Sequence, residues 1–182
     1  KIKNLVAKGD LIHLKQGFYL LGTDYGRDYS KEVIAGMLYG PSAVSFEYAL
    51  SYHGLIPERV EVLTSVCFKR NKAFSTPVGE FTYRYQPVEI YPLGIDLIQS
   101  ALGNFFLAGP EKALCDLAYD AKLSSRDEAS DYLLGSLRVD EAELRRLDTS
   151  LLLRLAQFHR RPSVRYLIEA LTPFTQKEPS NA

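Results

Sequence analysis

The stretch from Gly109 to Asp120, GPEKALCDLAYD, constrains the fold more than any other part of the chain. Its Gly-Pro pair ends the preceding segment, and proline is favoured at the first position of a helix because its missing N–H would have no partner there. Five apolar residues follow at helical spacing and share one stripe: Ala113, Leu114, Leu117, Ala118 and Ala121. The sequence therefore predicts a helix that buries one side against the body of the protein.

The other side of this predicted helix carries Lys112, Asp116 and Asp120 at intervals of four. Because residues four apart lie on the same helical face, we expect a row of charges that faces solvent or a partner. The alternative is a metal-dependent nuclease or other hydrolase that uses Glu111, Asp116 and Lys112. Such sites gather carboxylates from several strands, whereas these lie along one helix. We therefore expect no catalytic residue, no metal ligand and no cofactor here.

Composition and charge limit the functions that the chain can have. The 182 residues carry a formal net charge of zero, with 46% hydrophobic and 24% charged residues, which is typical of one globular domain with at most a small appendage. A neutral chain attracts nucleic acid only through local patches. The two cysteines, Cys67 and Cys115, are far apart in the sequence, so we expect buried thiols and a reducing compartment. No apolar run approaches the roughly 20 residues of a membrane span, so we expect a cytoplasmic location.

The first 21 residues, KIKNLVAKGDLIHLKQGFYLL, are typical of a helix end followed by a two-stranded hairpin. This is the order of elements in the back half of a winged helix-turn-helix. Four lysines and one acid give the segment a local charge of +3: Lys1, Lys3, Lys8, Lys15 and Asp10. These lysines either approach DNA phosphates or simply solvate a hairpin. We expect phosphate contacts, with the front of the motif lying upstream of the first residue.

The segment GTDYGRDY at residues 22–29 predicts a linker between domains. We therefore divide the chain into 1–22 (the C-terminal part of a winged-helix domain), 30–174 (an α+β domain) and 175–182 (a flexible tail). In the second domain, Ser30 and Ser45 are expected to cap helices. Gly54 is expected to close the second helix, and the neighbouring His53 to complement the helix C-terminus rather than to act as a general base.

Alternating patterns predict β-strands between residues 60 and 108. The predicted strands are Val60 to Val66, Phe81 to Tyr85, Val88 to Tyr91 and Phe105 to Ala108. The aromatic residues of these strands are expected to belong to the core rather than to stack on exposed bases.

The last third of the chain is predicted to be helical, with caps at Ser125 and Asp140 and a last helix from Val164 to Leu171. Residues 145–165 contain six arginines and only one acid. Because the arginine fork matches carboxylate and phosphate groups, we expect a surface for a partner protein or for RNA; the alternative is an ordinary basic surface. The predicted partner-binding residues are Arg154, Arg160, Arg161 and Arg165.

The order of the segments resembles the AbiEi family of antitoxins, from bacterial abortive-infection toxin-antitoxin systems. The resemblance runs from Lys1 to Asp120 and rests on the basic hairpin ending in GFYLL, the segment PSAVSFEYALSYHGL, the aromatic β region and the segment LAGPEKALCDL. It implies a non-enzymatic protein that binds operator DNA as an autoregulator and antagonises a nucleotidyltransferase toxin. An alternative is a protein-interaction domain without DNA binding.

The resemblance also implies roles for individual residues. It places DNA contacts at Lys8, Lys15 and Gln16 on the wing, and a shared structural core at Ser45, Glu111, Lys112 and Asp116. Lys3 and His13 of the same segment complete the predicted DNA-binding residues. It implies an α+β fold: a partial winged helix-turn-helix followed by a domain with a mostly antiparallel sheet and a helical C-terminal part.

Overall fold

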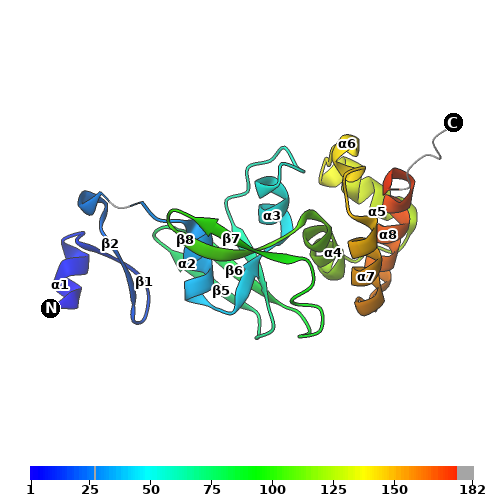
Figure 1. Cartoon of the computed structure of the whole chain (residues 1–182). Coiled ribbons are helices and arrows are strands. Elements are labelled where there is room, and N and C mark those ends of the chain that lie inside the picture. The colour runs from blue at the N-terminus through cyan, green and yellow to red at the C-terminus, as the bar shows by residue number, and fades with distance from the viewer. Residues whose placement is uncertain (27, 176–182) are drawn as a thin grey trace.

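The computed structural model describes residues 1–26 and 28–175 and shows an elongated α+β protein built of three parts (Figure 1). A helix and a hairpin form the N-terminal end, a six-stranded sheet forms the middle, and short helices form the other end. One hydrophobic core runs through all three parts, from Leu14 in the hairpin to Leu171 in the last helix.

The N-terminal part consists of α1 (Ile2–Ala7), β1 (Leu11–Lys15) and β2 (Phe18–Leu21). The strands pair antiparallel around Gly17, whose φ of +79° suits a tight turn that only glycine makes without strain. They form a sheet separate from the larger one. The predicted helix end and hairpin are therefore confirmed as secondary structure. The short 3-10 helix η1 (Thr23–Tyr25) then leads towards the second part.

The large sheet has the strand order β5-β6-β4-β3-β8-β7. Its strands are β3 (Ser42–Val44), β4 (Leu63–Cys67), β5 (Lys72–Thr76), β6 (Gly79–Tyr85), β7 (Ile95–Ser100) and β8 (Gly103–Ala108). Two of the neighbouring pairs, β3 with β8 and β4 with β6, are parallel, and the other three are antiparallel. The sheet is thus mixed.

Three helices pack around this sheet: α2 (Lys31–Leu38), α3 (Phe46–Tyr52) and α4 (Pro110–Asp120). The predicted cap of α2 is confirmed, since Ser30 Oγ accepts a hydrogen bond from Val33 N. Tyr83 of β6 donates to the carbonyl of Ala35, which ties α2 to the sheet at 2.7 Å. Helix α4 lies between the sheet and the terminal helices (Figure 1), and this placement buries it on more than one side.

The terminal part contains α5 (Arg126–Asp131), the π-helical turn η2 (Tyr132–Ser136), α6 (Glu141–Leu144), α7 (Thr149–Phe158) and α8 (Pro162–Thr175). The predicted caps at Ser125 and Asp140 are confirmed, because each side chain accepts a hydrogen bond from the first turn of its helix. Helix α8 continues through Pro173 to Thr175, past the predicted end at Leu171. The rest of the predicted tail, 176–182, lies outside the described residues.

Several local predictions in the sheet region differ from the structure. The strand predicted from Val60 to Val66 begins only at Leu63. Val88 to Tyr91 form turns rather than a strand, because the segment lies between Pro87 and Pro92, which cannot donate to a strand ladder. The strands β3, β5 and β7 were not predicted. At the end of α3, Gly54 adopts the expected left-handed conformation with φ of +76°, and His53 Nε2 lies 2.9 Å from the carbonyl oxygen of Ala108.

Candidate functional site

The charged row predicted on α4 is not on the surface. The side chains of Lys112 and Asp116 have no exposed area at all, and their Nζ and Oδ1 atoms lie 2.6 Å apart. Only Asp120 of the predicted row is exposed, 3.7 Å from Arg84. The prediction of a solvated or partner-facing row is therefore wrong, because Ser45, which precedes α3, and Gln86, which follows β6, lie against Lys112 and Asp116.

Asp116 is the centre of this buried polar cluster. It accepts hydrogen bonds from Lys112, from Gln86 Nε2 at 2.6 Å and from Ser45 Oγ at 2.6 Å. Lys112 also donates to Gln86 Oε1 at 2.5 Å. Ser45 is the N-cap residue of α3, as predicted, but its hydroxyl donates to Asp116 and makes no hydrogen bond with the first turn of the helix. Such a network offsets the desolvation of the two charges and ties α4 to two other segments.

The neighbouring Glu111 has a similar linking position. It is 8% exposed, and its Oε1 accepts a hydrogen bond from the backbone N–H of Asp148 at 2.7 Å, at the start of α7. Within residues 1–26 and 28–175, no group of three or more histidine, cysteine or acidic side chains is arranged to hold a metal ion. Glu111, Lys112 and Asp116 thus lie in the interior as connections between elements.

The predicted DNA-contacting residues divide into two groups. Lys3, Lys8, His13 and Gln16 are exposed on the N-terminal part, as is Lys1. The ring centroid of His13 lies 5.0 Å from that of Tyr19 on the paired strand. This end of the molecule therefore presents three lysines to solvent on a small unit with its own sheet.

Lys15 differs from the other predicted contacts. Its ammonium donates a hydrogen bond to the carbonyl of Leu38, at the end of α2, and lies 4.4 Å from the ring centroid of Phe18 and 5.6 Å from that of Phe74. A cation is favoured both at the C-terminus of a helix and over aromatic faces. Lys15 therefore joins the hairpin to α2 and β5, whereas the sequence analysis expected it to contact DNA.

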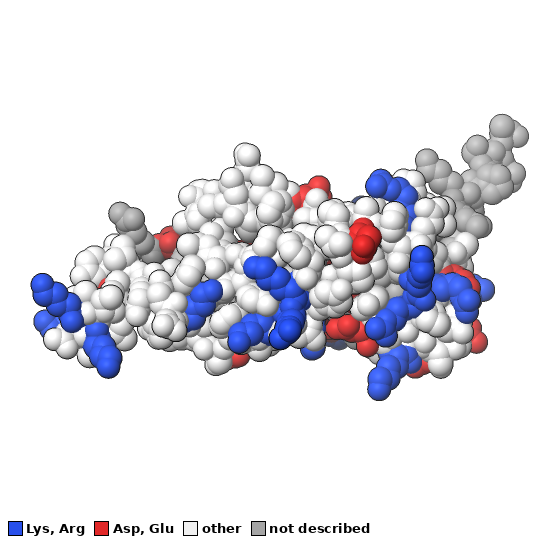
Figure 2. Space-filling view, turned by 90° about the horizontal axis from the view of Figure 1, so that it is seen from below, with Lys and Arg blue, Asp and Glu red and all other residues white. Residues whose placement is uncertain are grey.

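Basic side chains gather on one long face of the molecule. Figure 2 shows lysines and arginines at the hairpin end, over the middle and over the helical end. On this face as a whole, basic side chains cover more of the surface than acidic ones do. In the sheet region the exposed basic residues are Lys69, Arg70, Lys72 and Arg84. Because net charge is zero, such a face is the kind of local patch through which this chain attracts polyanions.

The arginines of residues 145–165 do not form one surface. Arg145 lies 3.6 Å from Glu141, and Arg146 lies 2.6 Å from Glu143, so local ion pairs offset these two charges. Arg154 is exposed on α7. The remaining three, Arg160, Arg161 and Arg165, meet around the start of α8, where they line a cavity.

Two cavities adjoin the start of α8. The larger, of about 750 Å³, contains Arg160, Arg161, Tyr119 and Phe158 in its wall. The smaller, of about 280 Å³, is lined by Arg160, Arg161, Arg165 and His159, among others. His159 is 4% exposed, and within the described part of the chain neither of its ring nitrogens has a hydrogen-bond partner. Burial, and then the nearby charge of Lys112, lower the pKa of His159 to about 4, so the ring is neutral at pH 7.

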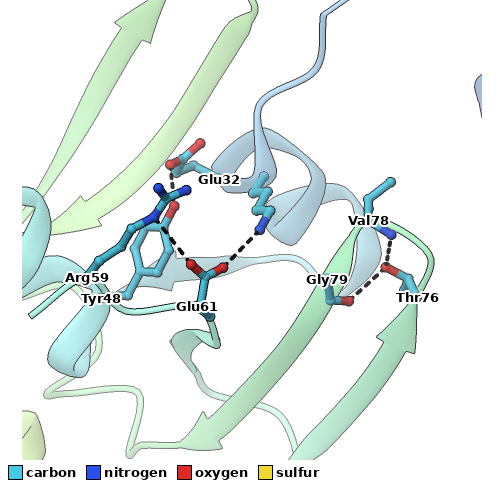
Figure 3. Close-up of polar contacts among 8 residues, drawn as sticks. Glu32, Tyr48, Arg59, Glu61, Thr76, Val78 and Gly79 are labelled. Atoms are coloured by element: carbon cyan, nitrogen blue, oxygen red, sulfur yellow. Dashed lines mark hydrogen bonds and ion pairs between the residues drawn. The ribbon is translucent and has the colours of Figure 1, made fainter. Parts of the chain in front are cut away.

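A third cavity, of about 440 Å³, opens between α2 and α3. Its lining includes Glu32, Tyr48, Arg59 and Glu61, whose polar contacts Figure 3 shows. Tyr48 donates to Glu32 at 2.7 Å, and Arg59 lies 3.2 Å from Glu61. Although burial raises the pKa of Glu32, hydrogen bonds from Ser30 and Tyr48 outweigh it and lower this pKa below its ordinary value. The charges at this cavity are balanced and paired, and the sequence indicated only the Ser30 cap.

No model of a known protein family matches the chain, and no curated protein matches its sequence. Across the described ranges, none of the helices combines the length and apolar character needed to cross a membrane.

Proposed function

We propose that this chain is a DNA-binding regulator of the AbiEi antitoxin type, whose larger domain binds a nucleotidyltransferase toxin. The observation that supports DNA binding best is the exposure of Lys1, Lys3 and Lys8 on a small N-terminal unit. This unit has its own two-stranded sheet and lies at one end of an elongated molecule. A duplex can approach such an end without contacting the rest of the protein.

The arrangement of this unit supports a winged helix. In this proposal, α1 is the end of a recognition helix, and β1 with β2 is the wing. His13 and Gln16 are exposed on the hairpin, where they can donate or accept hydrogen bonds with the DNA backbone. Lys15 has a different role, because its contacts with Leu38 and Phe74 fix the wing relative to the second domain.

The number of free lysines sets the expected salt dependence. Three phosphate contacts give a slope of about −2.7 for log K against log salt concentration, whereas four contacts with Lys15 included would give about −3.6. The difference is measurable. Binding by these residues alone is weak and depends little on sequence.

The test is a titration of fluorescently labelled duplex DNA, taken from upstream of the gene, at several KCl concentrations. The double variant Lys3→Gln/Lys8→Gln is expected to reduce the slope by about 2, since two phosphate contacts are lost. The matched control is Lys122→Gln, which removes an exposed lysine from the other end of the molecule. An unchanged slope for the double variant would contradict the proposal.

For the toxin, the proposed contact surface lies on α7 and α8, at Arg154, Arg160, Arg161 and Arg165, whose side chains are all exposed. Replacing Arg160 and Arg161 by glutamate is expected to weaken the rescue of toxin-arrested cells. The control is the same replacement at Arg145 and Arg146, whose charges are offset by local ion pairs. Full rescue by the Arg160/Arg161 variant would remove this surface from the proposal.

A further inference from the structure

The start of α8 combines the features of an anion site. The helix has fourteen residues, begins at Pro162 and has no acidic residue in its first turn. Ser163 does not cap it, because its hydroxyl donates to the carbonyl oxygen of Ala121 at 2.7 Å. The positive end of the helix dipole therefore has no acid of the first turn to compensate it. Pro162 has no N–H, and the N–H groups of Val164 and Arg165 donate to Arg161 O, so the dipole and the arginine side chains favour an anion here more than free backbone groups do.

Three arginines surround this helix start. Arg160 and Arg161 directly precede Pro162 and form no ion pair within the described part of the chain. The Arg161 guanidinium lies 4.4 Å from the ring centroid of Tyr119, which restricts its position. Arg165, one turn further on, lies 5.1 Å from the ring centroid of Tyr166 and 3.6 Å from Glu169, an exposed pair that offsets part of its charge. Guanidinium groups donate two parallel hydrogen bonds to phosphate oxygens, so the three are well suited to that group.

His159 is a second, independent observation at the same place. It lines the smaller cavity and is 4% exposed, yet both ring nitrogens lack a partner within residues 1–26 and 28–175. Buried polar side chains nearly always have a hydrogen-bond partner, and one without any points to a missing ligand or water. A neutral imidazole can donate to a phosphate oxygen with one nitrogen. Because both ring nitrogens of His159 are themselves buried, a phosphate in the cavity reaches one of them only when the ring turns towards it.

The larger cavity adds a surface for a flat ring. Phe158 is 45% exposed and lies in its wall beside Gln157 and Glu89, whose polar ends can pair with the edge of a base. Aromatic side chains of this kind stack on nucleic-acid bases with little preference among them. With about 750 Å³, the cavity has the size of a small-molecule site.

We infer that the two cavities together bind a nucleoside phosphate, with the phosphate held by Arg160, Arg161 and Arg165 at the start of α8 and the base against Phe158. The ligand is either a free nucleotide or the unpaired end of a nucleic-acid strand, since both offer the same chemistry. The inference does not depend on DNA binding by the N-terminal lysines.

The test is isothermal titration of the full chain with inorganic phosphate, with adenosine monophosphate and with a short single-stranded oligonucleotide. We expect the nucleotide to bind at least tenfold more tightly than phosphate. Arg160→Gln/Arg161→Gln should weaken all three ligands at least tenfold, and Phe158→Ala should weaken the two that carry a base. Arg126→Gln, an exposed arginine of α5 that lines neither cavity, is the matched control and should change nothing.

The outcomes separate the alternatives. Tighter binding of the oligonucleotide assigns the site to nucleic-acid ends, and tighter binding of the nucleotide assigns it to a free ligand. Absence of binding at millimolar concentration overturns the inference, and so does equal binding of phosphate and nucleotide with no effect of Phe158→Ala. The urea midpoint of each variant shows whether it folds. Lys3→Gln/Lys8→Gln should bind the nucleotide normally, so a failure of the proposed DNA binding remains distinguishable.

Discussion

Replacing Lys112 by methionine is expected to destabilise the fold strongly. Methionine keeps most of the apolar stem but removes the ammonium that lies 2.6 Å from Asp116 and 2.5 Å from Gln86. The Asp116 carboxylate then remains fully buried with only the donors of Ser45 and Gln86. Removing one partner of a buried ion pair typically lowers the free energy of unfolding by about 3–5 kcal/mol. A domain has roughly 5–15 kcal/mol in total, so the loss is a large fraction of its stability.

The double variant Lys112→Met/Asp116→Leu distinguishes a buried charge from a general loss of packing. It removes both charges, so no unpaired carboxylate remains in the interior. Ser45 and Gln86 still lose an acceptor, at about 1–3 kcal/mol each. We therefore expect the double variant to be no less stable than Lys112→Met alone and the two single effects to be non-additive by about 2 kcal/mol or more.

The assay is urea unfolding followed by circular dichroism, with the slope against urea checked for constancy. For 182 residues, a loss of about 4 kcal/mol corresponds to a fall in Tm of roughly 10 °C. The control is Asp120→Asn on the same helix, whose exposed pair with Arg84 should contribute about 1 kcal/mol or less. A loss below about 1 kcal/mol for Lys112→Met would refute the view that this pair stabilises the interior.

Three further predictions follow from buried or bound side chains. Folding lowers the pKa of His159 to about 4, whereas the unfolded chain takes up this proton near pH 6.5. The free energy of unfolding should therefore fall by up to about 3 kcal/mol between pH 6.5 and pH 4. His159→Phe should remove this part of the pH dependence of urea unfolding. Cys67 and Cys115 are fully buried, and burial raises the pKa of both thiols. A thiol reagent should therefore react with both only in denaturant, and rapid reaction of either in the native protein would contradict their burial. Lys15→Met should free the hairpin from α2 and speed proteolysis in the linker 22–29, with little change in the urea midpoint; unchanged cleavage would contradict the anchoring role.

Local sequence rules predicted where the helices and strands lie better than they predicted which sides of these elements are buried and what they contact. The Gly-Pro start of α4 and its apolar stripe are visible in the sequence, but periodicity does not show that a second layer covers the opposite side. Lysine and aspartate are rarely buried unless paired, so Lys112 and Asp116 were assigned to the surface. For Ser45, a local capping rule competed with an acceptor 71 positions away, and only the folded chain shows which of the two the hydroxyl contacts.

The candidate sites show the same limit. Arg145 and Arg146 lie three or four positions from acids, so their ion pairs could have been predicted from helical spacing. The meeting of Arg161 with Tyr119 brings the loop before α8 against α4, and no spacing in the sequence indicates it. Lys15 was misplaced for a similar reason, since a basic hairpin residue can contact DNA or its own protein equally well.

The most direct test of the account is to map where the N-terminal unit lies on DNA. Because both native cysteines are buried, a cysteine introduced by Lys8→Cys can be labelled selectively with an iron-EDTA cleavage reagent. The account predicts cuts clustered within one site upstream of the gene, and none from the control Lys122→Cys labelled in the same way. Equal, scattered cutting from both positions, or no cutting from position 8, would contradict the claim that this unit binds duplex DNA.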